Sequence, residues 1–301
     1  MSEAAVQIID AAAATALLPR RDRDGHKGTF GTLVCICGSL DYAGAAILSG
    51  TAGMRAGAGL VCLAVPASLQ PLFAGRVPEL VTLGLPETAD SGAGTDIVAM
   101  DAGQALKTRV PDALVFGSGL KETDGYAELL AGLLVREGPP IVVDGGGLNL
   151  LARAGEWWRD VKRPLVLTPH PGEFERLNGV AAGASDEERQ TAARAAAHRF
   201  SQVLVLKGAR TVVAAPDARL AASGVANAAL ATAGSGDVLA GAIGSLIAQG
   251  VEPFNAACLG VYLHAQAGER LSWRMGNAGI LASDIAAELP ATRHELDAHA
   301  G

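Results

Sequence analysis

The sequence predicts an α/β protein with a central, mostly parallel sheet that is covered by helices on both faces. Short apolar runs alternate with longer segments of helical spacing, which is the pattern of repeated βα units. Hydrophobic residues make up 50% of the 301 residues, which is enough for a large core. Because no change in composition divides the chain, we expect an N-terminal extension over residues 1–24 and one domain over residues 25–301.

The apolar runs in the first part of the domain are the expected parallel strands. TLVCICGS at 32–39 is followed by the small-residue segment 43–59, which predicts a strand and then a helix. Further strands are expected within the segments 60–66, 113–120, 140–153 and 163–177.

A helix and three closely spaced strands are expected next. Ser185 with Glu188 three residues later has the capping-box pattern of a helix start. The runs at 203–208, 211–216 and 219–223 are separated only by short turns, so we expect short antiparallel strands at one edge of the sheet.

The last part of the chain is expected to be helical. The segment GSGDVLAGAIGSLIAQG, which begins at Gly234, predicts an amphipathic helix, and two more helices are expected through about Leu289. The apolar stripe of the first of these helices would consist of Leu239, Ile243, Leu246 and Ile247.

Charge and composition argue against several classes of function. The net charge of −7, without a block of Lys or Arg, argues against a nucleic-acid partner, and no apolar run is long enough to indicate a membrane partner. Glu3 and Asp10 stand where a signal peptide has positive charge, so we expect a cytoplasmic protein. The cysteines lack Cys-x-x-Cys spacing and are expected to be reduced core thiols: Cys35, Cys37, Cys62 and Cys258.

Candidate binding residues follow the predicted strands. In an open parallel sheet, ligands bind beyond the carboxyl ends of the strands. The segments CGSLDYAGAA (37–46), FGSGLKETDG (116–125) and TPHPGE (168–173) are three such ends, which can face one crevice. Each segment taken alone is also explained as a tight turn between a strand and a helix, and for an isolated Gly-x-Gly the turn is the better interpretation.

The stretch GSGD at 234–237 opens a helix and therefore predicts an anion site. Free N–H groups and the positive end of the helix dipole attract phosphate, and Gly234 and Gly236 would let a phosphate approach the backbone. Asp237 has two interpretations: a favourable charge at a helix start, or the proton acceptor for phosphoryl transfer to an alcohol. The sequence contains no P-loop motif.

Two further segments carry polar candidates. Glu173 in HPGE would orient Mg²⁺ through water, or it is simply an acid in the first turn of a helix that begins near Pro171. Lys207 and Thr211 in LKGART would lie against a nucleotide, or they belong to a hairpin turn. His264 has no partner pattern and is interpreted as a structural or surface residue.

Taken together, these stretches resemble the ADP- or ATP-dependent NAD(P)H-hydrate dehydratases, a branch of the ribokinase-like superfamily. The resemblance runs from about residue 25 to 290, and the segments occur in the family's order. They are HKGTFG, YAGAA with RAGAGLV, LTPHPGEF, LKGARTVVA and ALATAGSGDVLAG. The resemblance implies a ribokinase-like fold and a repair reaction, in which phosphate from ADP or ATP is placed on the hydroxyl of hydrated NADH or NADPH and is then eliminated.

The resemblance also implies roles for individual residues. Asp237 would be the base, beside an anion hole formed by the backbone of Ala233, Gly234, Ser235 and Gly236. The nucleotide would be lined by Lys207, Gly208, Ala209, Arg210, Thr211 and Gly236. The hydrated dinucleotide would lie at Ala45, Gly119, His170 and Asp237. Mg²⁺ with ADP or ATP as co-substrate, a homo-oligomer and an epimerase on a separate chain are further implications.

Two departures bear on the assignment. Related kinases carry Asn-x-x-Glu where this chain has His170 and Glu173, which favours the dehydratases. The segment DGGGLNLL keeps Asp144 but lacks the second acid that is common in the family. Two alternatives stay open: a small-molecule kinase of the same fold, such as a thiazole or pyrimidine alcohol kinase, and a nucleotide-sensing module without turnover.

Overall fold

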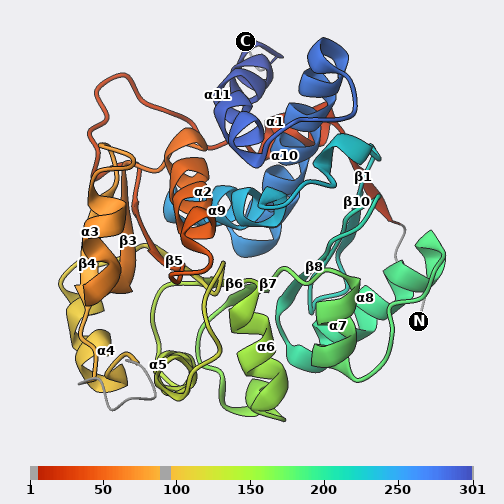
Figure 1. Cartoon of the computed structure of the whole chain (residues 1–301). Coiled ribbons are helices and arrows are strands. Elements are labelled where there is room, and N and C mark those ends of the chain that lie inside the picture. The colour runs from red at the N-terminus through yellow and green to blue at the C-terminus, as the bar shows by residue number, and fades with distance from the viewer. Residues whose placement is uncertain (1–5, 89–95, 300–301) are drawn as a thin grey trace.

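The computed structural model describes residues 6–88 and 96–299. Within them, one ten-stranded sheet runs through the protein in the order β1-β10-β9-β8-β7-β6-β5-β2-β3-β4. The strands are β1 Gln7–Ile9, β2 Thr32–Ile36, β3 Leu60–Pro66, β4 Val81–Leu85, β5 Ala113–Phe116, β6 Ile141–Val143, β7 Leu165–Leu167, β8 Val203–Leu206, β9 Val212–Ala214 and β10 Leu220–Ser223. The chain path is shown in Figure 1.

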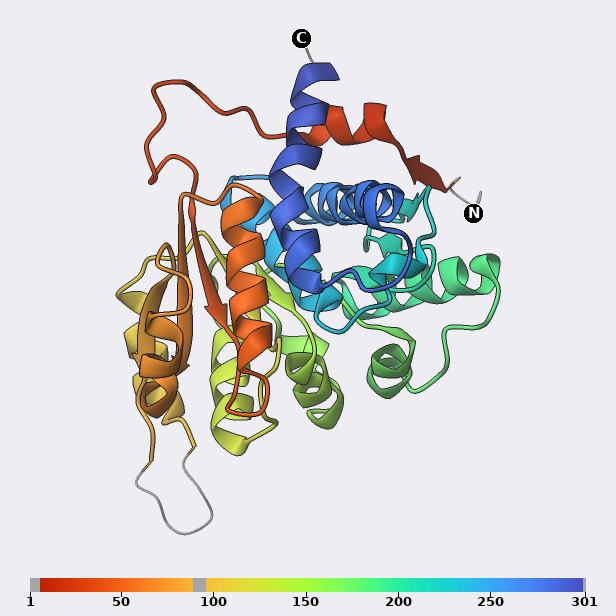
Figure 2. The same ribbon diagram turned by 45° about the horizontal axis from the view of Figure 1, so that its top comes forward.

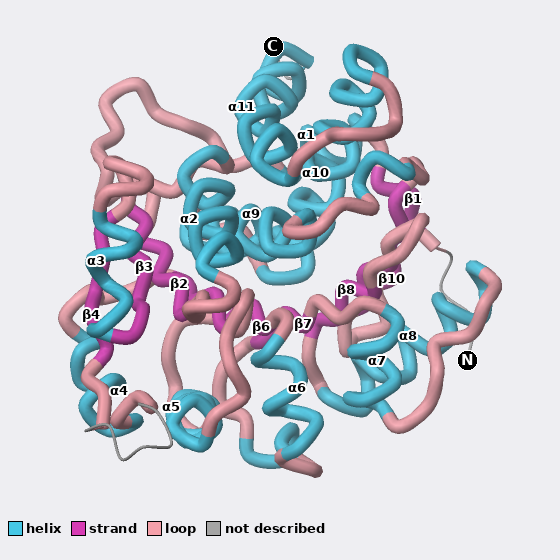
Figure 3. Tube along the Cα trace, viewed as in Figure 1, coloured by secondary structure: helices cyan, strands magenta, loops and turns pink. Residues whose placement is uncertain are grey.

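Helices cover both faces of this sheet. The α-helices are α1 Ala11–Leu17, α2 Ala43–Arg55, α3 Gln70–Ala74, α4 Ala99–Lys107, α5 Asp124–Leu134, α6 Gly146–Arg153, α7 Pro171–Asn178, α8 Asp186–Phe200, α9 Ser235–Ala248, α10 Pro253–Met275 and α11 Ala282–His299. Short 3₁₀ segments are η1 Ala67–Leu69, η2 Trp157–Asp160 and η3 Ala228–Leu230. In Figure 3, α2, α9, α10 and α11 lie above the sheet and α4 to α8 lie below it.

The direction of the strands confirms the predicted α/β class. All neighbouring pairs from β4 across to β8 are parallel, as the repeated βα units predict. The antiparallel part is β9, which is antiparallel to both β8 and β10. The outer edge beyond β10 is formed by β1, which pairs with it in parallel. The sequence pattern did not predict β1 or β4, because β1 is largely exposed and β4 is only partly buried, so neither has the fully buried apolar run of a central strand.

The residues of the central strands are buried on both faces, as expected for a parallel sheet under two helical layers. In β2, Leu33 and Cys35 pack with α9 and α10 in one core cluster. Val34 and Ile36 point the other way, into the cluster formed with α5 and α8. The four cysteines are free and buried, which confirms the prediction of core thiols.

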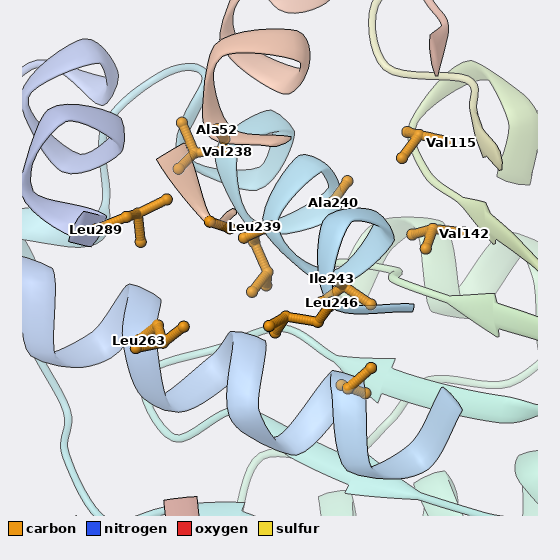
Figure 4. Close-up of a cluster of buried hydrophobic side chains, with 14 of the residues drawn as sticks. Ala52, Val115, Val142, Val238, Leu239, Ala240, Ile243, Leu246, Leu263 and Leu289 are labelled. Carbon is orange, nitrogen blue, oxygen red and sulfur yellow. The ribbon is translucent and has the colours of Figure 1, made fainter. Parts of the chain in front are cut away.

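Helix α9 is buried on all sides, so the prediction of an amphipathic helix was wrong. Every residue from Val238 to Ala248 is buried. Figure 4 shows why: side chains of α9 meet the sheet, α2, α10 and α11 in different directions. The side opposite the apolar stripe carries small residues that let α2 approach, and a Cβ added at Gly241 would lie 2.1 Å from the carbonyl oxygen of Ser49. The helix therefore forms the centre of the upper layer.

Both ends of the described chain pack onto that upper layer, as the turned view in Figure 2 shows. Residues that precede position 25 contribute β1 to the main sheet and α1 to contacts with α10 and α11. Helix α11 passes Pro290 and continues to His299, beyond the predicted end near Leu289. The guanidinium group of Arg293 donates to the carbonyl oxygens of Ala56 and Pro19, which holds this extension in place. None of the helices in the described ranges is long and apolar enough to cross a membrane.

Candidate active site

The N-terminus of α9 lies at the carboxyl ends of the central strands. The chain enters the helix through Gly234, which has a left-handed backbone with φ of 88°. A Cβ at this position would lie 2.4 Å from Cδ1 of Leu48, so both the conformation and the space require glycine. The N–H of Ser235 donates to the carbonyl of Thr232 and that of Val238 to Gly234. The N–H groups between them, at Gly236 and Asp237, have no acceptor within the helix and are available to an anion, whereas that of Ser235, part of the predicted anion hole, is already bonded.

Asp237 occupies the first turn of α9 and is only partly exposed. Its pKa is raised from 3.8 to about 7 because burial disfavours the charged carboxylate, and the nearby carboxylate of Asp144 adds repulsion. The ammonium group of Lys207 and a hydrogen bond with Ser118 act in the opposite direction. A carboxylate with a pKa near neutrality can accept a proton and release it again at physiological pH.

Asp144 is the centre of a buried polar cluster beside Asp237. It follows β6 and is 3% exposed. Its Oδ1 accepts hydrogen bonds from Nζ of Lys207 at 2.9 Å and from Oγ1 of Thr168 at 2.7 Å, and its Oδ2 accepts one from Oγ of Ser118 at 3.1 Å. Ser118, Asp144, Thr168 and Lys207 each follow a parallel strand, so residues after four strand ends meet in this cluster.

Sequence analysis missed Ser118 and Thr168 as members of the site. Their position could have indicated them, because each is the first polar residue after a fully buried strand. Small hydroxyl residues are also common in turns, so this signal becomes useful only after the strand order is known.

Lys207 brings positive charge to the start of α9. Burial lowers its pKa, but the carboxylates of Asp144 and Glu173 outweigh that effect, so the pKa is raised and the ammonium group stays charged. Its Nζ lies 3.8 Å from Oε2 of Glu173. The same Nζ lies 3.1 Å from the place that a Cβ at Gly236 would occupy. The positive charge of Lys207 is therefore beside the free N–H groups at the start of α9.

A cavity of about 620 Å³ opens next to these groups. Its lining includes His170, Lys207, Gly208, Ala209, Thr211, Ser235 and Gly236, seven of the predicted site residues. Arg210 does not line the cavity; its guanidinium group lies 3.5 Å from Asp186 on the surface.

His264 reaches this cavity from α10, which sequence analysis had not predicted. Its Nε2 lies 2.8 Å from Oγ of Ser235 and 3.0 Å from the carbonyl oxygen of the same residue. Burial lowers the pKa of His264 to about 4, so the ring is neutral near pH 7. The Ser235 side chain is therefore directed to the α10 side, and its main-chain N–H is taken by the carbonyl of Thr232.

His170 and Glu173 form the capping box of α7. Nδ1 of His170 accepts from the N–H groups of Gly172 and Glu173, and Oε2 of Glu173 accepts from the N–H of His170 at 2.8 Å. Pro171 is the first helical residue, as the helix-start interpretation predicted. The Glu173 side chain is 8% exposed, whereas that of His170 is 52% exposed and can reach a ligand.

Ala45 and Gly119 lie against each other, and neither residue lines the cavity. A Cβ at Gly119 would lie 2.6 Å from Cβ of Ala45, so the loop after β2 and the loop after β5 meet there. Gly119 directly follows Ser118, whose hydroxyl donates to Asp144. Lys121 and Asp41 join the same two loops through a surface ion pair of 3.1 Å.

Comparison with known proteins gives a consistent result. A family model described as NAD(P)H-hydrate dehydratase matches residues 33–291. A bifunctional NAD(P)H-hydrate repair enzyme of Moorella thermoacetica is 41% identical over 97% of this chain and 54% of its own length. An ADP-dependent (S)-NAD(P)H-hydrate dehydratase of Neisseria meningitidis is 39% identical over 91% of this chain and 87% of its own length. The chain thus spans about half the length of the bifunctional relatives.

Solved structures agree with these relatives. The crystal structure of an ADP/ATP-dependent NAD(P)H-hydrate dehydratase from Bacillus subtilis, co-crystallized with ATP and Mg²⁺, has a TM-score of 0.83 at 29% identity and covers 97% of this chain and 99% of its own. A hydroxyethylthiazole kinase from Pyrococcus horikoshii has a TM-score of 0.59 at 16% identity, which shows a shared fold only.

Proposed function

The chain belongs to the NAD(P)H-hydrate dehydratase family, and we propose from this premise that it converts hydrated NADH or NADPH back to the reduced dinucleotide, with ADP or ATP as phosphate donor. The observation that carries the proposal is the position of Asp237. A partly buried carboxylate with a pKa of about 7 lies in the first turn of an anion-binding helix, next to a cavity of nucleotide size.

The first step is phosphorylation of the hydrate. Asp237 takes the proton from the hydroxyl on the nicotinamide ring, and the hydroxyl oxygen forms a bond to the terminal phosphorus of the nucleotide. The bond from that phosphorus to the donor oxygen breaks, which releases AMP from ADP or ADP from ATP. The amides of Gly236 and Asp237 and the charge of Lys207 stabilise the transferred phosphoryl group, which carries negative charge throughout.

The second step is elimination of phosphate. Hydroxide is a poor leaving group, whereas a phosphate ester departs readily when the ring nitrogen supplies an electron pair. Loss of a proton from the neighbouring carbon then restores the double bond. The net products are the reduced dinucleotide, inorganic phosphate and AMP or ADP.

We assign separate places to the two substrates. The cavity beside Gly208, Ala209 and Thr211 is assigned to the nucleotide. The loops that meet at Ala45 and Gly119 are assigned to the hydrated dinucleotide, together with the half-exposed His170, which lines the cavity. Arg210 is assigned a role at the rim, because its side chain does not line the cavity.

Mg²⁺ enters the site with the nucleotide in this proposal. The described residues contain no group of three or more acids, cysteines or histidines that could hold a metal ion by themselves. Mg²⁺ bound to phosphates keeps several waters, and Glu173, whose carboxylate lies 3.8 Å from Nζ of Lys207, would contact such a water. When bound, the ion neutralises phosphate charge and so favours transfer.

The proposal includes three statements about the cellular context: a cytoplasmic location, a homo-oligomeric assembly, and an epimerase on another chain that interconverts the two forms of the hydrate. The assembly is supported by large apolar side chains exposed near the end of α10, where Trp273 is 90% and Met275 53% exposed. Sedimentation at several protein concentrations measures the assembly, and a monomer throughout would contradict it.

The test of the function is product analysis. We expect that protein, Mg²⁺, NADH hydrate and either ADP or ATP restore the absorbance of reduced nicotinamide and release inorganic phosphate. Mixtures without nucleotide or with Asp237→Asn are the controls. A stable phosphate ester without recovery of absorbance would assign the chain to a kinase, and no consumption of either nucleotide would refute an enzymatic function on this substrate.

A further inference from the structure

Helix α10 holds the loop that leads into α9 through two of its side chains. Nδ2 of Asn227 in this loop donates to Oγ of Ser272 at 2.9 Å. Nearer the anion site, Nε2 of His264 lies 2.8 Å from Oγ and 3.0 Å from the carbonyl oxygen of Ser235. Positions 264 and 272 are about two helical turns apart, so both side chains lie on one face of α10. Of these two contacts, the one made by His264 reaches the start of α9 itself.

The carbonyl of Ser235 decides which ring nitrogen of His264 carries the hydrogen. A carbonyl oxygen can only accept, so the hydrogen bond at 3.0 Å requires a hydrogen on Nε2. Without that hydrogen, the lone pair of Nε2 would face the lone pairs of the carbonyl oxygen. Burial and the charge of Lys207 lower the pKa of the ring to about 4, although the bond to the Ser235 carbonyl acts in the opposite direction. His264 is therefore a neutral donor near pH 7, with its single hydrogen on Nε2.

The carbonyl of Ser235 and the N–H of Gly236 belong to the same peptide group. In a trans peptide these two groups point in opposite directions, so the N–H of Gly236 points away from His264. No acceptor for this N–H occurs among the described residues, and Nζ of Lys207 lies beside Gly236. Hydrogen bonds in a chain polarise one another. A donor at the carbonyl end therefore makes the N–H at the other end a stronger donor to an anion.

We propose that His264 is a positioning residue for the phosphate-binding peptide: its Nε2–H fixes and polarises the peptide group between Ser235 and Gly236, whose N–H then binds the transferred phosphoryl group. The hydrogen bond from His264 stays in place during transfer, and no proton leaves the ring. The inference rests on the proposed function for the transfer step. Binding of ADP alone tests the peptide group without that step.

Two substitutions at position 264 separate the hydrogen bond from packing. His264→Leu fills the space but removes the donor, whereas His264→Gln can place an N–H near the position of Nε2. Loss of one hydrogen bond at the phosphate site should lower the affinity for ADP about fivefold in His264→Leu, and His264→Gln should restore most of it. The matched control is Ser272→Ala, which removes the other hydrogen bond between α10 and the same loop and should leave the affinity unchanged.

Calorimetry of the full chain with ADP measures these affinities. A loss in His264→Leu that is restored in His264→Gln supports the proposal. Wild-type affinity in His264→Leu overturns it. An equal loss in Ser272→Ala also overturns it, because α10 would then only anchor the loop.

NMR tests the hydrogen bond directly in the wild-type protein. With ¹⁵N-labelled histidine, the His264 ring is assigned by its loss in His264→Gln and should carry its hydrogen on Nε2 from pH 6 to pH 8. A hydrogen on Nδ1 overturns the proposal, whether or not His264→Leu folds.

A second NMR signal reports on the peptide group. A hydrogen bond to a carbonyl draws electron density from the nitrogen of the same peptide, so the ¹⁵N signal of Gly236 should move in His264→Leu and stay in place in Ser272→Ala. The signal is assigned by its loss in Gly236→Ala. An unmoved Gly236 signal in His264→Leu refutes the polarisation.

The dehydration assay separates this inference from the proposed function. His264→Leu should lower kcat about tenfold, which is more than it raises the KM for nucleotide, because the Gly236 N–H acts on the phosphoryl group during transfer. A change in KM alone would overturn the positioning role. If wild-type protein shows no dehydration at all, the proposed function fails, while ADP binding and the position of the ring hydrogen still decide on the peptide group.

Discussion

Replacing Asp237 with Asn should stabilise the folded protein at alkaline pH while it removes activity. The folded-state pKa is about 7 and the ordinary value is 3.8, chiefly because the carboxylate is buried. The folded state therefore binds more protons than the unfolded state between these pH values, and stability falls as pH rises through them. A shift of about three units at about 1.36 kcal/mol each corresponds to about 4 kcal/mol above pH 7.

Asparagine does not titrate, so the variant avoids this loss. We expect its gain in the free energy of unfolding to grow from about 1.5 kcal/mol at pH 5 to about 4 kcal/mol at pH 8. Turnover should fall by about 10² to 10⁴, the usual contribution of a general base, while nucleotide binding persists. Urea unfolding at both pH values measures the first effect, and the dehydration assay with a nucleotide titration measures the second.

Asp160→Asn is the matched control, because it makes the same chemical change on the exposed η2 segment. Its effect on stability should be small and equal at both pH values. If Asp237→Asn gives the same stability change at pH 5 and pH 8, the carboxylate does not have a raised pKa. If it retains wild-type turnover, Asp237 is only a charge at the start of a helix.

Three other changes test packing, pairing and capping. Gly241→Ala places a Cβ 2.1 Å from the carbonyl oxygen of Ser49 and should lower the free energy of unfolding by about 2–3 kcal/mol. Its control is Gly132→Ala in α5, where the new Cβ meets no atom within 4 Å and should raise the free energy of unfolding by about 1 kcal/mol. Equal urea midpoints for the two variants would contradict the close contact of α2 with α9. Lys207→Met leaves Asp144 buried without its cation and should lower the free energy of unfolding by about 3 kcal/mol. Adding Asp144→Asn to this variant should recover the stability but not the nucleotide affinity, which calorimetry measures. A double variant no more stable than the single one would show that the pair is not coupled. Ser185→Ala removes the cap of α8 and should cost about 1 kcal/mol without changing nucleotide affinity, and an unchanged midpoint would argue against the capping box.

The fold was predictable where a local pattern decides the structure. The apolar runs identified the central strands, and Ser185 with Glu188 identified the start of α8. Strands β1 and β4 were not predicted, because β1 is largely exposed and β4 only partly buried, so neither has the buried apolar run that identified the central strands. The apolar stripe of α9 showed one buried face, but the glycines and alanines on its other side gave no sign that α2 packs there.

The site was predictable as a set of segments but not as a network. The stretch GSGD placed Asp237 at a helix start, and the strand-end rule placed His170 and Lys207 near it. The raised pKa of Asp237 could not be predicted, because it depends on burial and on the nearby Asp144. Likewise, Lys207 and Asp144 are 63 residues apart, and only the order of β6 and β8 in the sheet brings them together.

The burial of α9 on every side determines how the molecule can fluctuate. Opening the amides from Ala240 to Ile247 requires separation of the sheet from α2, α10 and α11, so they should exchange with deuterium only when the whole protein unfolds. The first amides of the same helix, at Gly236 and Asp237, have no intrahelical acceptor and should exchange quickly until an anion covers them. A single helix should thus join slowly and quickly exchanging amides, and protection at its first turn would report directly on phosphate occupancy.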